Sequence, residues 1–299
     1  MYPAAGLPSR DATVIPLPTP HVRPLREPGP FGRLLRFWRG VHALSQEELA
    51  LATGVSHRHV SFLENGRSRP GRSMVLALAD VFGLAPQDRN TLLVAAGFAA
   101  EQAPVDLDSP GLGWLGKSLE HSLRALDPWP ASVLDRHGNL HLVNRAWLSL
   151  YRSLVPPAAL TGPLNSYRLY FSEEGLRPQL VDWEEVACRL LVTLQQEVLL
   201  SGEEAARELL DSLLAYPSIP ADWRRRGAAI AHQHSFRVRL RRGDSVQVWL
   251  NTVNTVGATP YVGEPRLMIG LMTPEDLVPE RSRAALLADD TLRHPLLPY

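Results

Sequence analysis

Side chains that can contact nucleic acid are concentrated in one short stretch of the sequence, residues 44–70. From Phe31 to Arg72 the chain carries seven arginines against three glutamates, although its overall net charge is zero. A locally basic segment in a neutral chain has the electrostatics that phosphate binding needs. This stretch therefore predicts contact with DNA, whereas the bulk composition indicates neither a nucleic-acid nor a membrane partner.

Two short helices must position these side chains. Ser45 can cap the first helix, with Glu48 completing a capping box, and this helix is expected to end near Thr53-Gly54. Ser56 can cap the second helix, which should run to Asn65-Gly66, where glycine permits a left-handed turn. A helix, a tight turn and a second helix that enters the DNA major groove are the elements of a helix-turn-helix domain.

The expected DNA contacts follow from the orientation of the second helix. Val60 and Leu63 must face the core, so the opposite face points outward. There Arg58 could bind a guanine, His57 a base or a phosphate, and Phe62 a thymine methyl group. Packing against a neighbouring helix or a second protomer is an equally weighted interpretation of Phe62. Gln46 and the residues after position 64 are expected to contact phosphates and not bases. The full set of expected DNA-contacting residues is Gln46, Ser56, His57, Arg58, Ser61, Phe62, Asn65, Arg67 and Arg69.

The whole segment 31–100 predicts a compact domain of five short helices. The first helix, FGRLLRFWRGVHAL, places Leu34, Leu35, Trp38 and Val41 on one face, and further helices follow around 74–82 and 87–96. Residues 1–30 contain eight prolines and predict a disordered leader, for which DNA contact is the weaker interpretation. The acidic segment 101–111, EQAPVDLDSPG, is expected to be a linker.

The motifs LSQEELALATGV, SHRHVSFLENGRSRP and MVLALADVFGL, within residues 31–97, resemble the XRE family of phage-repressor-like helix-turn-helix domains. The resemblance implies that Arg39 on the first helix pairs with Glu64 on the third, a salt bridge that orients the DNA-contacting helix. A helical bundle that has lost DNA binding is the weaker alternative. One such domain buries too little surface for genomic specificity, so we expect a homodimer on a double-stranded DNA operator.

Beyond residue 112 the pattern becomes mixed. After a helix near 114–126, two apolar runs flank Asp135-Arg136-His137-Gly138, a hairpin turn with glycine at the position of positive φ. Helices follow from Asn144 and over 183–200 and 203–215, and strands of period two over 236–240, 246–250 and 267–272. This order predicts an α+β domain over 112–274, an antiparallel sheet with helices on one side. The tail, 275–299, is expected to contain one short helix near 281–288, but the sequence does not predict where this tail packs.

The motifs DRHGNLHLVNRAW, VDWEEVACRLL and VWLNTVNTVGATP resemble the ligand-binding domain of MmyB-like transcription regulators, a PAS-like module. The resemblance implies a small-molecule sensor with a pocket between the sheet and a helical insert, and fatty acids as the ligands of some members. Large aromatic side chains suit such a pocket, although core packing is commoner for any one of them. Three polar candidates could bind a carboxylate, although a surface position is commoner for either arginine. Together the candidates are Trp129, Asn144, Arg145, Trp147, Tyr151, Arg168, Phe171, Trp183 and Trp249.

Motifs of catalysis and metal binding are missing from the sequence. It has no Gly-rich phosphate loop, GxSxG or HExxH motif, so we expect no enzyme. The pairs His57/His59, His137/His141 and His232/His234 lack acidic or thiol partners at metal spacing, and Cys188 is the one cysteine, so neither a metal nor a cofactor is expected. Without a secretory signal or an 18-residue apolar run, we expect a cytoplasmic protein with no membrane span.

Two functions fit these features. The first is a sequence-specific DNA-binding regulator whose DNA affinity is modulated by a small apolar ligand, such as a fatty acid. The second is a haem- or flavin-bearing sensor or an enzyme domain fused to a DNA-binding domain that targets it.

Overall fold

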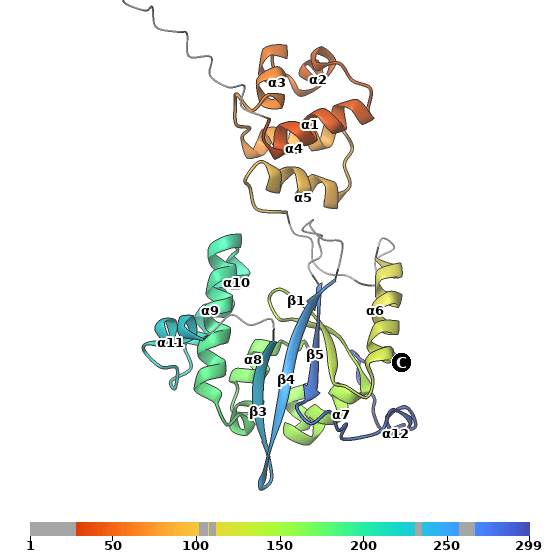
Figure 1. The fold of residues 1–299 in the computed structure, drawn as a ribbon, viewed down its shortest axis with the longest axis vertical. Coiled ribbons are helices and arrows are strands. Elements are labelled where there is room, and N and C mark those ends of the chain that lie inside the picture. Colours follow the sequence, from red (N-terminus) through yellow and green to blue (C-terminus); the bar gives the residue numbers. More distant parts are fainter. Residues whose placement is uncertain (1–27, 102–106, 108–111, 231–234, 257–266) are drawn as a thin grey trace, which may run out of the picture. The chain divides into compact units, whose positions relative to one another are not determined.

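A computed structural model describes residues 28–101, 107, 112–230, 235–256 and 267–299 (Figure 1). The chain divides into two compact units between Gly71 and Arg72. Residues 1–27 of the predicted leader lie outside the described residues, as does the predicted linker apart from Glu101 and Leu107. Of the helices in the described part of the chain, none has the length and apolar content that a membrane span requires.

The first unit contains the predicted helix-turn-helix: α1 (Pro30–Val41), α2 (Gln46–Thr53) and α3 (His57–Glu64). The predicted capping box is confirmed, because Ser45 N donates to Glu48 Oε2 at 2.6 Å and Glu48 N donates to Ser45 Oγ at 3.1 Å. Ser56 Oγ accepts a hydrogen bond from the backbone of His59 at 3.2 Å. Local capping chemistry thus fixes where both helices of the motif begin.

Helix α1 packs through a different part of its length from the one predicted. Leu35 is buried as expected, but Val41 is 56% exposed, and Phe31 and Gly32 are buried instead. A Cβ atom on Gly32 would lie 2.5 Å from the carbonyl oxygen of Glu64. The backbones of α1 and α3 therefore meet at this glycine, which moves the closest contact to the beginning of α1 and leaves Val41 at its end exposed.

The carboxylate of Glu64 joins all three helices. Its side chain is 1% exposed, and its oxygens accept hydrogen bonds from Arg39 Nε at 2.6 Å and Gln46 Nε2 at 2.7 Å. Arg36 Nε lies 3.6 Å away. Burial raises the pKa of Glu64, but hydrogen bonds from Arg39 and Gln46 and the nearby guanidinium charges outweigh burial and lower this pKa. We call these four residues the Glu64 cluster; the predicted Arg39–Glu64 contact is present, and Gln46 is committed to it rather than turned wholly outward.

Helices α4 (Arg72–Val81) and α5 (Pro86–Ala95) begin the second unit and pack against each other. Both lie within two residues of their predicted positions. The end of α5 is linked to the following segment, because Asn90 Nδ2 donates to the Glu101 carbonyl oxygen and Glu101 N donates to Asn90 Oδ1, each at 2.7 Å.

A five-stranded antiparallel sheet forms the centre of the remaining domain, with the strand order β2-β1-β5-β4-β3. The predicted hairpin turn is confirmed, since Gly138 adopts φ 77° between the first two strands. A Cβ atom on Gly138 would also lie 2.6 Å from Cδ2 of Tyr167. The strands are β1 (Ala131–Asp135), β2 (Leu140–Val143), β3 (Ser235–Arg242), β4 (Ser245–Thr255) and β5 (Leu267–Pro274).

Helices cover both faces of this sheet, which corrects the expectation of helices on one side (Figure 1). Val133 of β1 packs with Leu119 and Leu123 of α6, while the alternate residue Leu134 packs with the larger core on the other face. The central strands are apolar on both faces, and each face must be covered. The helices are α6 (Gly113–Leu126), α7 (Arg145–Leu154), α8 (Ser166–Phe171), α9 (Trp183–Ser201), α10 (Glu204–Leu214), α11 (Trp223–Ala229) and α12 (Arg283–Leu287).

The C-terminal segment, which the sequence left without a place, packs onto this domain. Arg152 Nη1 donates to the carbonyl oxygen of Thr291 at 2.7 Å, and Leu292 is buried in the larger core. The hydroxyl of Tyr299 donates to Asp127 Oδ2 at 2.7 Å. Residues 283–299 are therefore part of the domain and not an appended tail.

Asn144 is a structural residue, which corrects its prediction as a ligand-binding group. Its Oδ1 accepts hydrogen bonds from the backbone nitrogens of Ala131 and Trp147, both at 2.9 Å, and its Nδ2 donates to the Trp129 carbonyl oxygen at 2.8 Å. The side chain is fully buried. It caps α7 and joins that helix to β1, so no part of it faces a ligand.

We predict that Glu64→Gln lowers the free energy of unfolding by about 1–3 kcal/mol at pH 7, because the buried guanidinium contacts lose their charged partner. The lowered pKa means that the Glu64 cluster stabilises the fold above the ordinary carboxyl pKa of 4.5 and loses this contribution as pH falls through the folded-state value. Urea denaturation across pH should show the deficit shrinking in acid. The exposed Glu47→Gln is the control, and an equal effect in both variants would contradict a special role for Glu64.

Asn144→Ala should lower the free energy of unfolding by about 2–4 kcal/mol, because it removes a helix cap and leaves buried backbone groups without partners. Urea denaturation measures this loss, and Asn254→Ala, on an exposed part of β4, is the matched control. A near-neutral Asn144→Ala would show that these hydrogen bonds do not hold α7 to the sheet.

Candidate DNA-contacting surface and ligand cavity

The outward face of α3 carries the predicted DNA-contacting side chains. Ser56, His57 and Arg58 are exposed. Phe62 is half-buried, with the guanidinium carbons of Arg58 and Arg67 5.1 and 5.9 Å from its ring centroid. Cation–π contact of this kind orders flexible arginines. The Phe62 ring thus contacts two exposed cations, from its own helix and from the following turn, and its contact with a neighbouring helix, a second protomer or DNA stays a prediction.

The segment after α3 presents further cations. Arg67 and Arg69 are exposed, and the backbone nitrogen of Arg67 donates to the Phe62 carbonyl oxygen at 2.8 Å, which fixes the turn. Asn65, also predicted to contact DNA, already uses its Nδ2 on the Ser61 carbonyl oxygen at 2.8 Å. Exposed cations on a fixed turn can neutralise phosphates without reading sequence.

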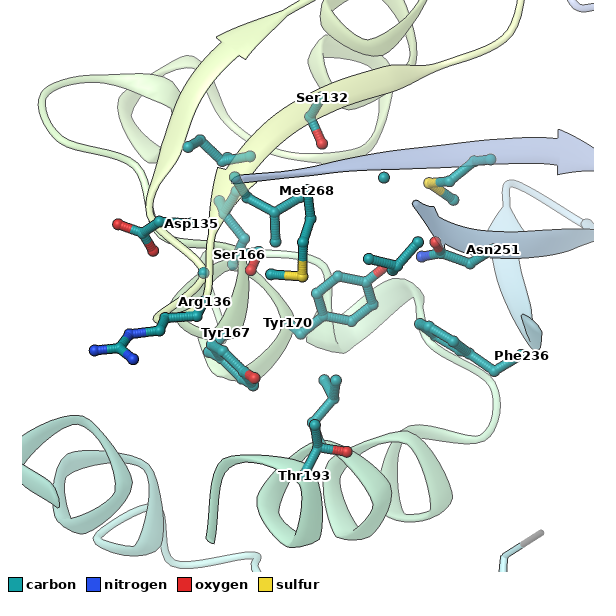
Figure 2. A pocket seen from close by; sticks show the side chains of 18 of the residues that line it. Ser132, Asp135, Arg136, Ser166, Tyr167, Tyr170, Thr193, Phe236, Asn251 and Met268 are labelled. Carbon is teal, nitrogen blue, oxygen red and sulfur yellow. The ribbon is translucent and has the colours of Figure 1, made fainter. Parts of the chain in front are cut away.

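A cavity of about 390 Å³ lies between the sheet and helices α7, α8 and α9 (Figure 2). Its volume is in the range of small-molecule pockets, and its lining is mostly apolar. Met268, Gly270 and Met272, which alternate along β5, line it from the sheet side. Across from them lie Leu190 and Thr193 of α9.

A group of polar side chains projects into this cavity. The rings of Trp147 and Tyr151 are stacked with centroids 3.9 Å apart. Burial raises the pKa of the Tyr170 hydroxyl, although hydrogen bonding with Tyr151 and Asn251 opposes that rise. Burial likewise raises the pKa of Tyr151, so both phenols are neutral at pH 7. The cavity therefore combines apolar walls with uncharged hydrogen-bonding groups.

Arg189 of α9 brings a positive charge to the cavity wall. Its guanidinium carbon lies 4.8 Å from the ring centroid of Phe236 on β3. Burial lowers the pKa of Arg189, yet arginine stays protonated in proteins. Arg189 and Phe236 also line a neighbouring hollow of about 740 Å³, so this pair forms the boundary between the two spaces.

The hairpin turn between β1 and β2 closes the cavity with paired charges. Arg136 lines the cavity and makes ion pairs with Glu197, at 3.2 Å, and with Glu203. His137 Nε2 lies 2.9 Å from the second oxygen of Glu203. Because these acids come from α9 and the segment before α10, the sequence spacing around His137 did not show them as partners.

Only Trp147 and Tyr151 of the predicted ligand-binding residues line this cavity. Phe171, Trp183 and Trp249 belong to the larger core, because a large apolar ring gains as much from packing as from a ligand, whereas Trp129 is half-buried. Phe171 is fully buried with its ring 6.0 Å from that of Trp183, and Trp129 and Trp249 line a separate, very small hollow.

The two predicted arginines also lie elsewhere. Arg145 Nη1 donates to the carbonyl oxygens of Leu286 and Asp289, at 3.3 and 3.0 Å, and so holds α12. Arg168 is exposed on α8 and does not line the cavity. Arg189, a cation that does line the cavity, carried one signal in the sequence, a charged residue between the apolar residues Cys188 and Leu190.

Comparisons with known proteins agree with this arrangement. The model of the MmyB-like transcription regulator ligand binding domain matches residues 115–286, and a helix-turn-helix domain model matches residues 30–92. Uncharacterised HTH-type transcriptional regulators of Mycobacterium bovis and Mycobacterium tuberculosis are 30% identical over 155 residues, which cover 50% of this chain and 57% of theirs. The chain thus spans little more than half the length of these relatives. One from Methanocaldococcus jannaschii is 33% identical over 54 residues, 18% of this chain and 82% of its own.

Two solved PAS domains are also similar to the chain. One, of an HTR-like protein from Haloarcula marismortui, has 10% identity and a TM-score of 0.24, covering 55% of this chain and 94% of its own. The other, of BvgS from Bordetella pertussis, has 18% identity and a TM-score of 0.25, covering 57% and 92%. The family matches and the antiparallel sheet bear out the predicted order of a helical domain followed by an α+β domain with an antiparallel sheet. The chain belongs to the MmyB-like transcription regulators, with a DNA-binding helix-turn-helix domain ahead of their ligand-binding domain.

Proposed function

We propose that this chain is a cytoplasmic transcriptional regulator that binds an operator as a homodimer through α3, and whose DNA affinity depends on a small apolar ligand such as a fatty acid. The observation that carries the proposal is the apolar cavity of about 390 Å³ within the region matched by a ligand-binding domain. An apolar ligand that fills a cavity of this size gains binding energy from the burial of apolar surface.

On the DNA side, the exposed side chains favour direct reading by the start of α3. The Glu64 cluster uses Arg36 and Arg39 internally, so the cations that remain exposed on this surface include Arg58, Arg67 and Arg69. Arg58 lies in the first turn of α3, the part of a recognition helix that contacts base edges. We therefore assign base contact to Arg58 and phosphate contact to the loop arginines.

On the ligand side, Arg189 supplies the positive charge that can bind the carboxylate of a fatty acid, in addition to the apolar walls that contact its chain. A guanidinium group binds a carboxylate strongly when both are partly shielded from water. The described lining residues include neither His nor Cys, the side chains that most often ligate haem iron, so this lining favours an apolar acid over haem. A ligand alters DNA affinity only if it binds two arrangements of the protein with different affinities.

Arg58→Ala should weaken binding to the DNA upstream of the protein's own operon by about 5- to 160-fold, because a base contact of this type contributes roughly 1–3 kcal/mol. Fluorescence anisotropy at fixed salt measures this change. Arg225→Ala removes an equal charge from an exposed position on α11 and is the control. Equal losses in both variants would point to non-specific charge effects and contradict a reading role for Arg58.

Arg189→Gln should reduce affinity for dodecanoic acid by about tenfold through loss of the charged hydrogen bond. Isothermal titration calorimetry measures the affinity, and Arg168→Gln, which changes an exposed arginine outside the cavity, should leave it unchanged. Native mass spectrometry of the wild type should show a dimer that carries a fatty-acid adduct. Failure of every fatty acid tested to bind, or visible absorption typical of haem or flavin, would overturn the proposed ligand class.

A further inference from the structure

Polar groups line the interior of a cavity whose walls are otherwise apolar, and they come from separate elements. Ser132 of β1 is 7% exposed, Tyr151 of α7 is 5% exposed and Tyr170 of α8 is 7% exposed. Asn251 of β4 lies beside Tyr170 and hydrogen-bonds with it (Figure 2). All four line the same cavity, and together we call them the polar group of the cavity.

The hydrogen-bonding capacity of these residues is not fully used by contacts among themselves. The amide of Asn251 has two donor hydrogens and an acceptor oxygen, more than the single hydroxyl of Tyr170 can use. The hydroxyl of Ser132 lies opposite Gly270, which has no side chain to offer it a hydrogen bond. Hydrogen-bonding capacity therefore remains directed into the cavity.

A plain hydrocarbon chain in this space would leave that capacity unused. Buried polar groups without partners destabilise a complex, and a site that is built to hydrogen-bond a ligand discriminates strongly against analogues that lack the matching atom. The polar group of the cavity, as well as its apolar walls, therefore determines which ligands bind tightly.

We infer that the ligand carries a neutral oxygen function along its chain, so that its class is a hydroxy- or oxo-substituted aliphatic acid and not an unsubstituted fatty acid. This inference rests on the proposed function, in which Arg189 binds the carboxylate. Tyr170 and Asn251 then bind the hydroxyl or carbonyl oxygen. The oxygen function is neutral, because the polar group of the cavity contains no cation that could balance a second charge.

Isothermal titration calorimetry with matched ligands tests the inference. The probes are dodecanoic acid and its monohydroxy and mono-oxo derivatives, with the substituent moved stepwise along the chain. In the wild type, at least one derivative should bind about tenfold more tightly than dodecanoic acid, the effect of one well-placed hydrogen bond. If dodecanoic acid binds as tightly as every derivative, water fills the hydrogen-bonding capacity and the inference is overturned.

Variants locate the interaction. Tyr170→Phe and, separately, Asn251→Leu should abolish the preference for the best derivative while keeping or increasing affinity for dodecanoic acid. Tyr216→Phe, which removes a hydroxyl outside the cavity lining, is the control and should change neither affinity. A preference that survives both cavity variants would contradict the assignment. If neither dodecanoic acid nor any derivative binds, the proposed function fails first, which separates the two outcomes.

Discussion

Burial of both faces of the central strands is the constraint on which the ligand-binding domain depends. In β1 and β5, Val133 and Ile269 are paired on the face toward α6, while Ser132 and Gly270 are paired on the face toward the cavity. Successive side chains of a strand point to opposite faces, so one short segment serves both purposes. On the α6 face these residues are close-packed. On the other face, small and flexible side chains leave the space that a ligand can occupy.

In the helical DNA-binding unit, the corresponding constraint is the burial of a carboxylate. Glu64 could not remain ionised in the interior without compensation, and the compensating groups come from α1, through Arg39, and from the start of α2, through Gln46. The orientation of α3 is thereby tied to both preceding helices. Since these hydrogen bonds are short and internal, they act on geometry more than on affinity for DNA.

The sequence predicted the elements whose causes are local. The capping box at Ser45, the turn at Gly138 and the strands of period two depend on neighbouring residues, and each was confirmed. The cavity lining depends on which strand face meets which helix, and periodicity alone cannot decide that for β1 and β5, which are apolar on both faces. The size of an aromatic side chain did not identify the cavity lining either, because a large ring also packs well in a core. The fully buried Phe171 is an example. Asn144 looked like a ligand contact because capping and ligand binding use the same chemistry.

The turn between β1 and β2 connects the cavity lining to α9 and α10 through ion pairs. Arg136 lines the cavity, and its ion pairs reach Glu197 near the end of α9 and Glu203 just before α10. A ligand that displaces Arg136 would break its ion pairs with Glu197 and Glu203, whose side chains are 18% and 26% exposed, and the loss of partly shielded ion pairs is costly. A ligand that leaves Arg136 in place adds apolar contacts and keeps the ion pairs, so it stabilises the arrangement described above by the amount its binding supplies. Arg136 therefore links the lining of the cavity to α9 and to the start of α10 through its ion pairs.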